Sequence, residues 1–149
     1  MLPVTDTGHG LAGNVGTQSL AVTIRVLMDE KLGLKEKITL VIKEMRVGLC
    51  NGLCLGTMAF VFLGLYINCF KGYGMGHAFL ISGCVGISLV VAMVISSLVG
   101  TLVPLFFHKI KVDPAVASGP LITTVNDLVA VVTYYGLSWV FLIRIMKIV

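Results

Sequence analysis

The stretch that decides the fold is residues 76–107, GHAFLISGCVGISLVVAMVISSLVGTLVPLFF, which contains no Asp, Glu, Lys or Arg. A helix needs about 20 residues to cross the hydrocarbon core of a bilayer, so this run is more than long enough, and tilt can absorb the excess. Pro104 is expected to end or bend the helix, because proline has no backbone N–H to donate. Residues 76–107 are therefore predicted to form a transmembrane helix.

Three further apolar runs accompany this stretch, at residues 10–28, 48–70 and 119–143. The last two match the length of a span outright, whereas residues 10–28 qualify only if their polar side chains face protein or water. All the runs are too long and too continuous for the alternating strands of a membrane barrel. We therefore expect an all-α membrane protein with about four transmembrane helices, in a single domain over residues 1–149.

The composition of the 149 residues agrees with this prediction, because 57% are hydrophobic and only 12% are charged. A soluble domain usually carries about 25% charged residues, and half that charge cannot cover a surface exposed to water. The lipid bilayer is therefore the expected partner of much of the chain. The charges cluster between the apolar runs without forming a basic stripe with interleaved aromatic residues, so no nucleic acid is expected to bind.

The segment at residues 33–47 joins the first two runs and has a different pattern. Its apolar residues follow helical spacing and charged residues occupy the other positions. This pattern predicts an amphipathic helix that lies on the membrane surface, or else an ordinary connecting helix.

Basic residues are distributed unevenly over the two sides of the predicted spans. One side holds Arg25, Lys31, Lys35, Lys37, Lys43, Arg46, Lys109 and Lys111, and the other holds Lys71, Arg144 and Lys147. The positive-inside rule places the first group in the cytoplasm. The sequence therefore predicts a multi-pass protein of the cell membrane with both chain ends outside the cytoplasm.

Small residues recur at four-residue spacing in two of the spans. The two series are Gly48, Gly52 and Gly56, and Ala92, Ser96 and Gly100. Such faces let helices approach each other closely in lipid, so we interpret both series first as packing features.

Asp127 is the only acid that lies well inside a predicted span. A charge at the centre of the bilayer costs about 3 kcal/mol on insertion scales, and no Lys or Arg lies in the middle of a span to pair with it. A bound cation is the natural partner of this carboxylate. The alternative is a protonated Asp127 that is hydrogen-bonded between helices.

The neighbours of Asp127 support cation binding. Thr123 and Thr124 lie four and three residues earlier and share its helix face. Hydroxyl and carboxylate oxygens suit a hard cation such as Mg²⁺ or Ca²⁺. Asn126 points about 100° away, so we expect it to form a hydrogen bond between helices.

Asp113 and Pro114 precede this helix and are typical of an N-cap and the first helical position. Pro120 has no N–H and is expected to leave the Val116 carbonyl without a helical partner. Broken helices with free carbonyls bind ions in transporters, although a capped turn is the simpler alternative. Asp113 itself lies near the predicted cytoplasmic mouth, where it either concentrates cations or only caps.

Residues 13–18, GNVGTQ, are unusually polar for a span. Asn14 and Gln18 fall on one helix face, with the small residues Gly13 and Thr17 beside them. This arrangement fits a pore wall next to a hydrated ion. Hydrogen bonding between helices is the alternative.

Motifs of known catalytic sites are missing from the sequence. It contains no HxxxH pair, GxSxG or P-loop motif, and no second acid inside a span to form an acid–base pair with Asp127. We therefore expect neither an enzyme with catalytic residues nor a bound cofactor.

Two stretches resemble the signatures of one known family. LAGNVGTQS, at residues 11–19, is similar to the glycine–asparagine signature of the MgtE-type magnesium transporter family, to which solute carrier family 41 of animals is related. DPAVASGPLITTVND, at residues 113–127, is similar to that family's final-helix signature. The resemblance covers nearly the whole chain and corresponds to the family's C-terminal transmembrane domain.

The resemblance implies a homodimer with a pore on its axis, lined by the helices that hold residues 10–28 and 119–143. It implies that Asp127 holds hydrated Mg²⁺ and that Asp113 lies at the cytoplasmic mouth. Thr123, Asn14 and Gly13 are the further candidate residues of the ion site. The family's first transmembrane helix and its cytoplasmic N and CBS domains have no match, so no soluble sensor domain is expected.

The function expected from the sequence is a divalent-cation channel or transporter that moves hydrated Mg²⁺, the transported ion, down the membrane potential. One rival is a Mg²⁺ exchanger coupled to Na⁺ or H⁺, which would need a second ion gradient. The other is a membrane scaffold fragment without transport, which would show no flux.

Overall fold

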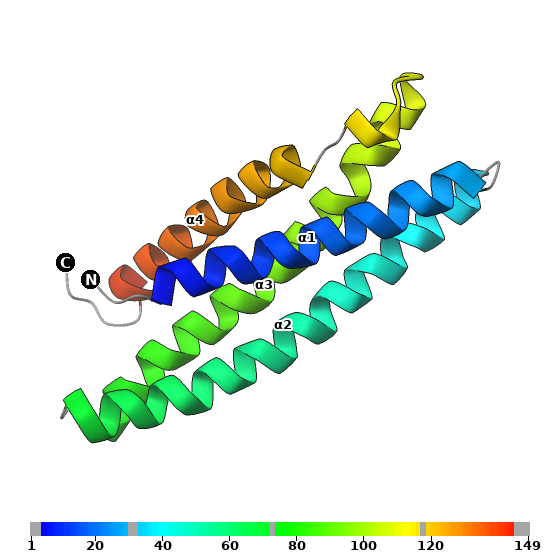
Figure 1. The fold of residues 1–149 in the computed structure, drawn as a ribbon. Helices are drawn as coiled ribbons and strands as arrows, with labels where there is room; N and C mark the ends of the chain where they lie inside the picture. The colour runs from blue at the N-terminus through cyan, green and yellow to red at the C-terminus, as the bar shows by residue number, and fades with distance from the viewer. Residues whose placement is uncertain (1–3, 30–32, 72–73, 117–118, 145–149) are drawn as a thin grey trace.

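The computed structural model describes residues 4–29, 33–71, 74–116 and 119–144. Within these ranges the chain forms four long α-helices and one short 3₁₀ helix (Figure 1). They are α1 (Val4–Asp29), α2 (Leu34–Lys71), α3 (Met75–Lys109), η1 (Pro114–Val116) and α4 (Gly119–Arg144). The predicted all-α class with four long helices is confirmed.

The four long helices lie side by side and alternate in direction (Figure 1). Helix α3 packs against the other three, α1 also packs against α4, and α1 scarcely touches α2. The start of α1 and the end of α4 lie at one end of the bundle, while η1 and the start of α2 lie at the other. Both described chain ends are thus on the same side, and which side faces the cytoplasm stays a prediction.

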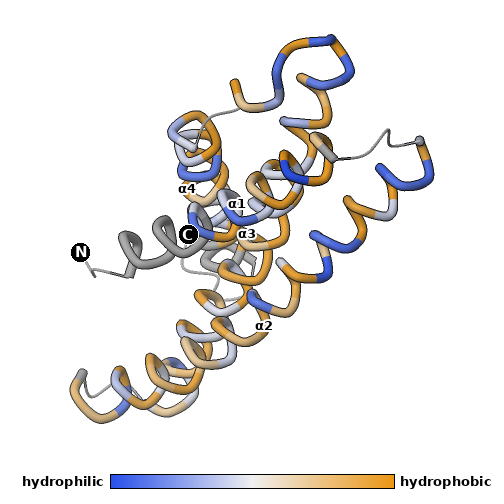
Figure 2. The backbone as a smooth tube through the Cα atoms, turned by 45° about the vertical axis from the view of Figure 1, so that its right-hand side comes forward, coloured by the Kyte–Doolittle hydropathy of each residue, from blue (hydrophilic) through white to orange (hydrophobic). Residues whose placement is uncertain are grey.

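Hydropathy divides the bundle into two kinds of helix. Among the described residues, α2 and α3 are the helices long and apolar enough to cross a membrane. In Figure 2 hydrophobic residues cover most of these two helices, and hydrophilic residues gather near η1 and the start of α2. The spans expected at residues 10–28 and 119–143 fall on α1 and α4, and their membrane position stays a prediction.

The segment at residues 33–47 is not a separate helix, so this prediction is wrong. Helix α2 runs from Leu34 to Lys71 without a break and passes through Gly48, where we expected the next span to begin. No proline interrupts this range, and Gly48 packs so closely on α3 that a Cβ atom there would lie 2.7 Å from the Ser97 Cβ. Close packing holds the helix together where its sequence pattern changes.

The two prolines expected to interrupt helices have different surroundings. Helix α3 continues past the buried Pro104 to Lys109, so Pro104 does not end it. Pro120 lies in the first turn of α4, where a missing N–H costs no helical hydrogen bond. The expected break falls between η1, which ends at Val116, and α4, which begins at Gly119. Residues 117–118 lie outside the described residues, and the free Val116 carbonyl stays a prediction.

The glycines of α2 bring its backbone against α3. A Cβ atom at Gly56 would lie 2.8 Å from the Gly86 carbonyl oxygen, and one at Gly52 would lie 2.9 Å from the Val90 Cα. The second series of small residues faces other helices: Ala92 packs against Ala130 of α4, and Gly100 meets α1. Both series are packing features, as expected, but they serve different neighbours.

Candidate functional site

Helices α1 and α4 bring three of the five predicted site residues together. A Cβ atom at Gly13 would lie 3.6 Å from Cγ2 of Thr123 and 4.0 Å from Oδ1 of Asp127. Because Gly13 has no side chain, the Asp127 carboxylate faces bare backbone of α1, and we call this glycine position the opening at Gly13. Gly13, Thr123 and Asp127 therefore form one cluster, which we call the α1–α4 site.

The Asp127 carboxylate is half-buried. Among the described residues it forms no hydrogen bond and no ion pair. The alternative was a protonated Asp127 that is hydrogen-bonded between helices. The described residues offer its carboxyl group no such partner. Its oxygens remain free to meet a cation or the water around one.

The two threonines before Asp127 use their protons within α4. Thr123 donates its hydroxyl to the Gly119 carbonyl at 2.8 Å, and Thr124 donates to the Pro120 carbonyl at 2.9 Å. Thr124 is exposed, whereas Thr123 is half-buried with its methyl group toward Gly13. The Thr123 oxygen keeps its lone pairs, so it can still accept a hydrogen bond from a water.

Asn14 lies next to Gly13 but on the exposed face of α1. Gln18 is also exposed, one turn further along the helix. The Thr17 hydroxyl donates back to the Gly13 and Asn14 carbonyls at 3.1 and 2.9 Å. The structure therefore shows a strip of free amides that borders the α1–α4 site without contacting Asp127.

Asp113 lies outside this cluster, at the start of η1. Its Oδ1 accepts a hydrogen bond from the Ala115 N–H at 2.9 Å, so the predicted cap is confirmed, although it caps η1 and not α4. The side chain is exposed. Asp127 lies about 12 Å along α4 from the start of that helix, so the two acids occupy different levels of the bundle.

Asn126 differs from its prediction in one respect. It lies between helices, as expected, and is fully buried against Gly16 of α1. Neither its Nδ2 nor its Oδ1 has a hydrogen-bond partner in the described part of the chain. The expected hydrogen bond between helices is therefore not formed there.

Sequence reasoning missed a second buried acid, Glu44, which is only 8% exposed. We had placed it on the polar face of an amphipathic helix. Its carbonyl oxygen accepts a hydrogen bond from the Ser97 hydroxyl at 2.5 Å, and that hydroxyl lies 3.1 Å from the Ser19 hydroxyl. The available signal was its position four residues before Gly48, in register with the small residues that face α3.

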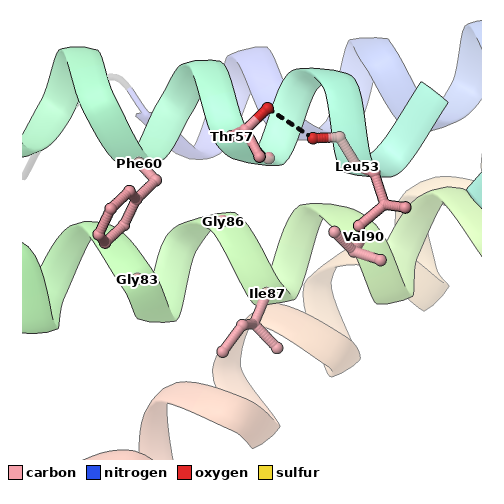
Figure 3. Close-up of a pocket in the computed structure, with 8 residues that line it drawn as sticks. Leu53, Thr57, Phe60, Gly83, Gly86, Ile87 and Val90 are labelled. Carbon is pink, nitrogen blue, oxygen red and sulfur yellow. Dashed lines mark hydrogen bonds between the residues drawn. The ribbon is translucent and has the colours of Figure 1, made fainter. Parts of the chain in front are cut away.

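A groove of about 300 Å³ lies between α2 and α3 (Figure 3). It is lined by Leu53, Gly56, Thr57, Phe60, Gly83, Gly86, Ile87 and Val90. The Thr57 hydroxyl donates to the Leu53 carbonyl at 2.8 Å, and none of the lining residues carries a carboxylate. The groove therefore lacks the chemistry of the α1–α4 site.

No group of three or more His, Cys, Asp or Glu side chains gathers within the described ranges in a way that could hold a bare metal ion. A single carboxylate per chain with neighbouring amides and hydroxyls suits a cation that keeps its water shell, as Mg²⁺ commonly does.

Comparison with known proteins gives a consistent result. The model of the MgtE family, described as divalent cation transporter, matches residues 9–137. This range includes α2, α3 and η1, most of α1 and α4, and all five predicted site residues.

Three curated relatives are each described as magnesium transporter MgtE. The protein of Bacillus subtilis (strain 168) is 38% identical over 134 residues, which are 89% of this chain and 28% of the relative. That of Enterococcus faecalis is 34% identical over 135 residues, covering 89% and 27%. That of Thermus thermophilus is 36% identical over 129 residues, covering 87% and 26%.

This chain thus spans about a quarter of the length of these relatives. The family model nevertheless covers most of this chain, and the expected class, a transporter rather than an enzyme, is that of the family. The chain belongs to the MgtE family of divalent cation transporters.

Proposed function

We propose that this chain forms the path by which a divalent cation, Mg²⁺ first of all, crosses a membrane, and that Asp127 holds the ion. The observation that carries the proposal is a half-buried carboxylate without a partner among the described residues, facing the opening above Gly13. The relatives' descriptions as magnesium transporters support the choice of ion.

The chemistry of the α1–α4 site fits a hydrated ion. Mg²⁺ gives up its water reluctantly and usually keeps several waters when it binds. The Asp127 carboxylate attracts the charge, while the Thr123 oxygen and the Asn14 amide offer hydrogen bonds to the water shell. Gly13 adds no side chain in front of the carboxylate, so in this proposal selectivity depends on the distance between the two copies of the site and on the placement of oxygens.

The exposed amides of α1 support a second copy of the chain. Asn14 and Gln18 face outward on a helix that is expected to lie in the membrane, and polar groups at that depth face water or protein. We therefore place the pore on the axis of a homodimer, where the two α1–α4 sites face each other. Two Asp127 carboxylates then balance the charge of one divalent ion.

The membrane potential supplies the driving force in this arrangement. A divalent cation that moves inward gains roughly 4.6 kcal/mol per 100 mV, twice the value for a single charge. We infer that the exposed Asp113 carboxylate lies at the mouth, where it raises the local cation concentration in addition to capping η1.

Uptake of Mg²⁺ into liposomes that contain the purified chain tests the proposal. Asp127→Asn keeps the shape and removes the charge, so we expect uptake to fall by about 10- to 100-fold, the loss of one strong charged interaction. Glu36→Gln removes an equal charge from an exposed position at the start of α2 and should leave uptake unchanged.

Three other outcomes would contradict the proposal in distinguishable ways. Normal uptake by Asp127→Asn would remove this residue from the mechanism. Uptake only in the presence of a Na⁺ or H⁺ gradient would identify a coupled exchanger. No uptake by the unmodified chain, measured together with its oligomeric state by cross-linking in the same liposomes, would favour the scaffold.

A further inference from the structure

Asn126 is the one side chain in the described residues whose buried polar atoms lack any hydrogen-bond partner. Its exposed fraction is 0%. An apolar contact lies on each side of it along α4: Ala130 packs against Ala92, and Ile122 packs against Leu20. A buried amide without a partner is unfavourable, so packing stability alone does not explain an asparagine at this position.

The amide of Asn126 occupies the space that a side chain at Gly16 would need. A Cβ atom at Gly16 would overlap the Asn126 Nδ2 and would lie 2.8 Å from the Ser96 Oγ. On its other side, Gly16 meets Gly100 of α3, where a Cβ atom would overlap the Gly16 carbonyl oxygen. Helices α1, α3 and α4 therefore meet at one point, with the Asn126 amide seated in a notch of α1.

This contact determines how α4 is rotated relative to α1. Successive residues of a helix point about 100° apart, so seating Asn126 in the Gly16 notch directs the next residue, Asp127, toward Gly13. A rotation of α4 that removed the amide from the notch would also turn the carboxylate away from the opening.

We propose that Asn126 is a positioning residue for the cation: its amide, seated in the notch at Gly16, fixes the rotation of α4 that presents Asp127 to the opening at Gly13. The inference rests on the proposed function, because it assigns Asn126 a role in the ion site and not only in packing. A polar side chain in an otherwise apolar contact is costly, but it accepts few alternative arrangements, which gives the contact its specificity.

A double-mutant cycle separates this role from general packing. Gly16→Ala should raise the Mg²⁺ concentration for half-maximal uptake by about tenfold, the effect of a typical coupling between contacting residues. Asn126→Ala removes the obstacle, so Gly16→Ala combined with Asn126→Ala should resemble Asn126→Ala alone.

Gly100→Ala is the matched control. It adds the same methyl group at the same junction, but the obstacle is the backbone of Gly16, so Asn126→Ala should not rescue it. The shift in the unfolding temperature of the detergent-solubilised chain on addition of Mg²⁺ gives a second measure that does not need transport. Where Gly16→Ala fails to fold, recovery of folded protein in the double variant reports the same rescue.

The proposal is overturned if Asn126→Ala alone leaves the half-maximal concentration unchanged, or if the double variant is more impaired than Asn126→Ala alone. It is also overturned if all variants lose maximal uptake with unchanged half-maximal concentration and unchanged Mg²⁺-dependent unfolding shift. If instead Asp127→Asn transports normally, the proposed function fails by itself. The double variant could also recover only the unfolding temperature measured without Mg²⁺, with no change in the half-maximal concentration or in the Mg²⁺-dependent shift. That result would show that the contact between Asn126 and Gly16 serves packing alone.

Discussion

Glycine is used in opposite ways in the α2–α3 contact and in the α1–α4 contact. Along α2, Gly52 and Gly56 let the backbone touch the backbone of α3 at Val90 and Gly86. Along α1, Gly13 and Gly16 face side chains, those of Thr123, Asp127 and Asn126. The first use brings backbone against backbone, and the second places polar side chains of α4 against the backbone of α1.

The difference indicates that the α2–α3 contact and the α1–α4 contact have different roles. Helices α2 and α3 are the described helices that meet the requirements of a membrane span, and their contact brings backbone against backbone. Helices α1 and α4 hold the exposed Asn14 and the half-buried Asp127. Changes in the first contact should therefore act on stability, and changes in the second on transport.

The largest effect that would test these roles is expected from Gly13→Val. Its Cβ alone would make only ordinary contacts, 3.6 and 4.0 Å from side-chain atoms of α4. The two further methyl groups press on side-chain ends and not on backbone, and valine is a better helix former than glycine, so the free energy of unfolding should fall by less than in Gly56→Val. The branched side chain fills the opening in front of Asp127, so Mg²⁺ uptake should fall by more than about tenfold. Liposome uptake and unfolding in detergent measure the two quantities.

A large loss of stability together with the loss of uptake would contradict the different roles of the two contacts at Gly13. It would mean that the opening is a tight packing contact, like those of the α2–α3 pair. Gly13→Ala is the milder companion, and it should reduce uptake less than Gly13→Val without affecting unfolding.

Gly56→Val is expected to have a smaller effect, on stability and not on Mg²⁺ uptake. Its Cβ would lie 2.8 Å from the Gly86 carbonyl oxygen and 3.0 Å from the Val90 Cγ2, so backbone has to move. Overpacking of this kind typically costs about 1–3 kcal/mol, which should appear as a lower unfolding temperature. The Mg²⁺ concentration for half-maximal uptake should stay unchanged in the protein that remains folded, and a shift in it would show that the two contacts are not independent.

The sequence predicted the helices better than it predicted their neighbours. Four-residue spacing identified Gly48, Gly52 and Gly56 as a packing face, which the contacts with α3 confirm. The same spacing could not tell that Gly100 meets α1, because a periodic pattern shows which residues share a face but not which helix covers it. Only the arrangement of the whole bundle determines that.

The candidate site was predictable to a similar extent. An acid inside an apolar run drew attention to Asp127, and helical spacing placed Thr123 with it, as the structure shows. Burial of Glu44 was not predicted, since its charged neighbours suggested a water-exposed face and the contact of its carbonyl with Ser97 is tertiary. The missing hydrogen bond of Asn126 was also beyond sequence reasoning, because it depends on what the facing helices offer.

The smallest effect is expected from Gly136→Ala on α4, and it tests the basis of the comparison. No atom lies within 4 Å of the place where the Cβ would be, and the position is exposed. Alanine in a helix interior is more favourable than glycine by about 1 kcal/mol, so the free energy of unfolding should rise slightly and Mg²⁺ uptake should stay unchanged. Should the variant instead lose stability or uptake, an atom outside the described residues lies against Gly136, and a second copy of the chain is the neighbour we infer. The exposed side of α4 would then belong to the contact between two copies, and the exposed amides of α1 would face protein as much as water.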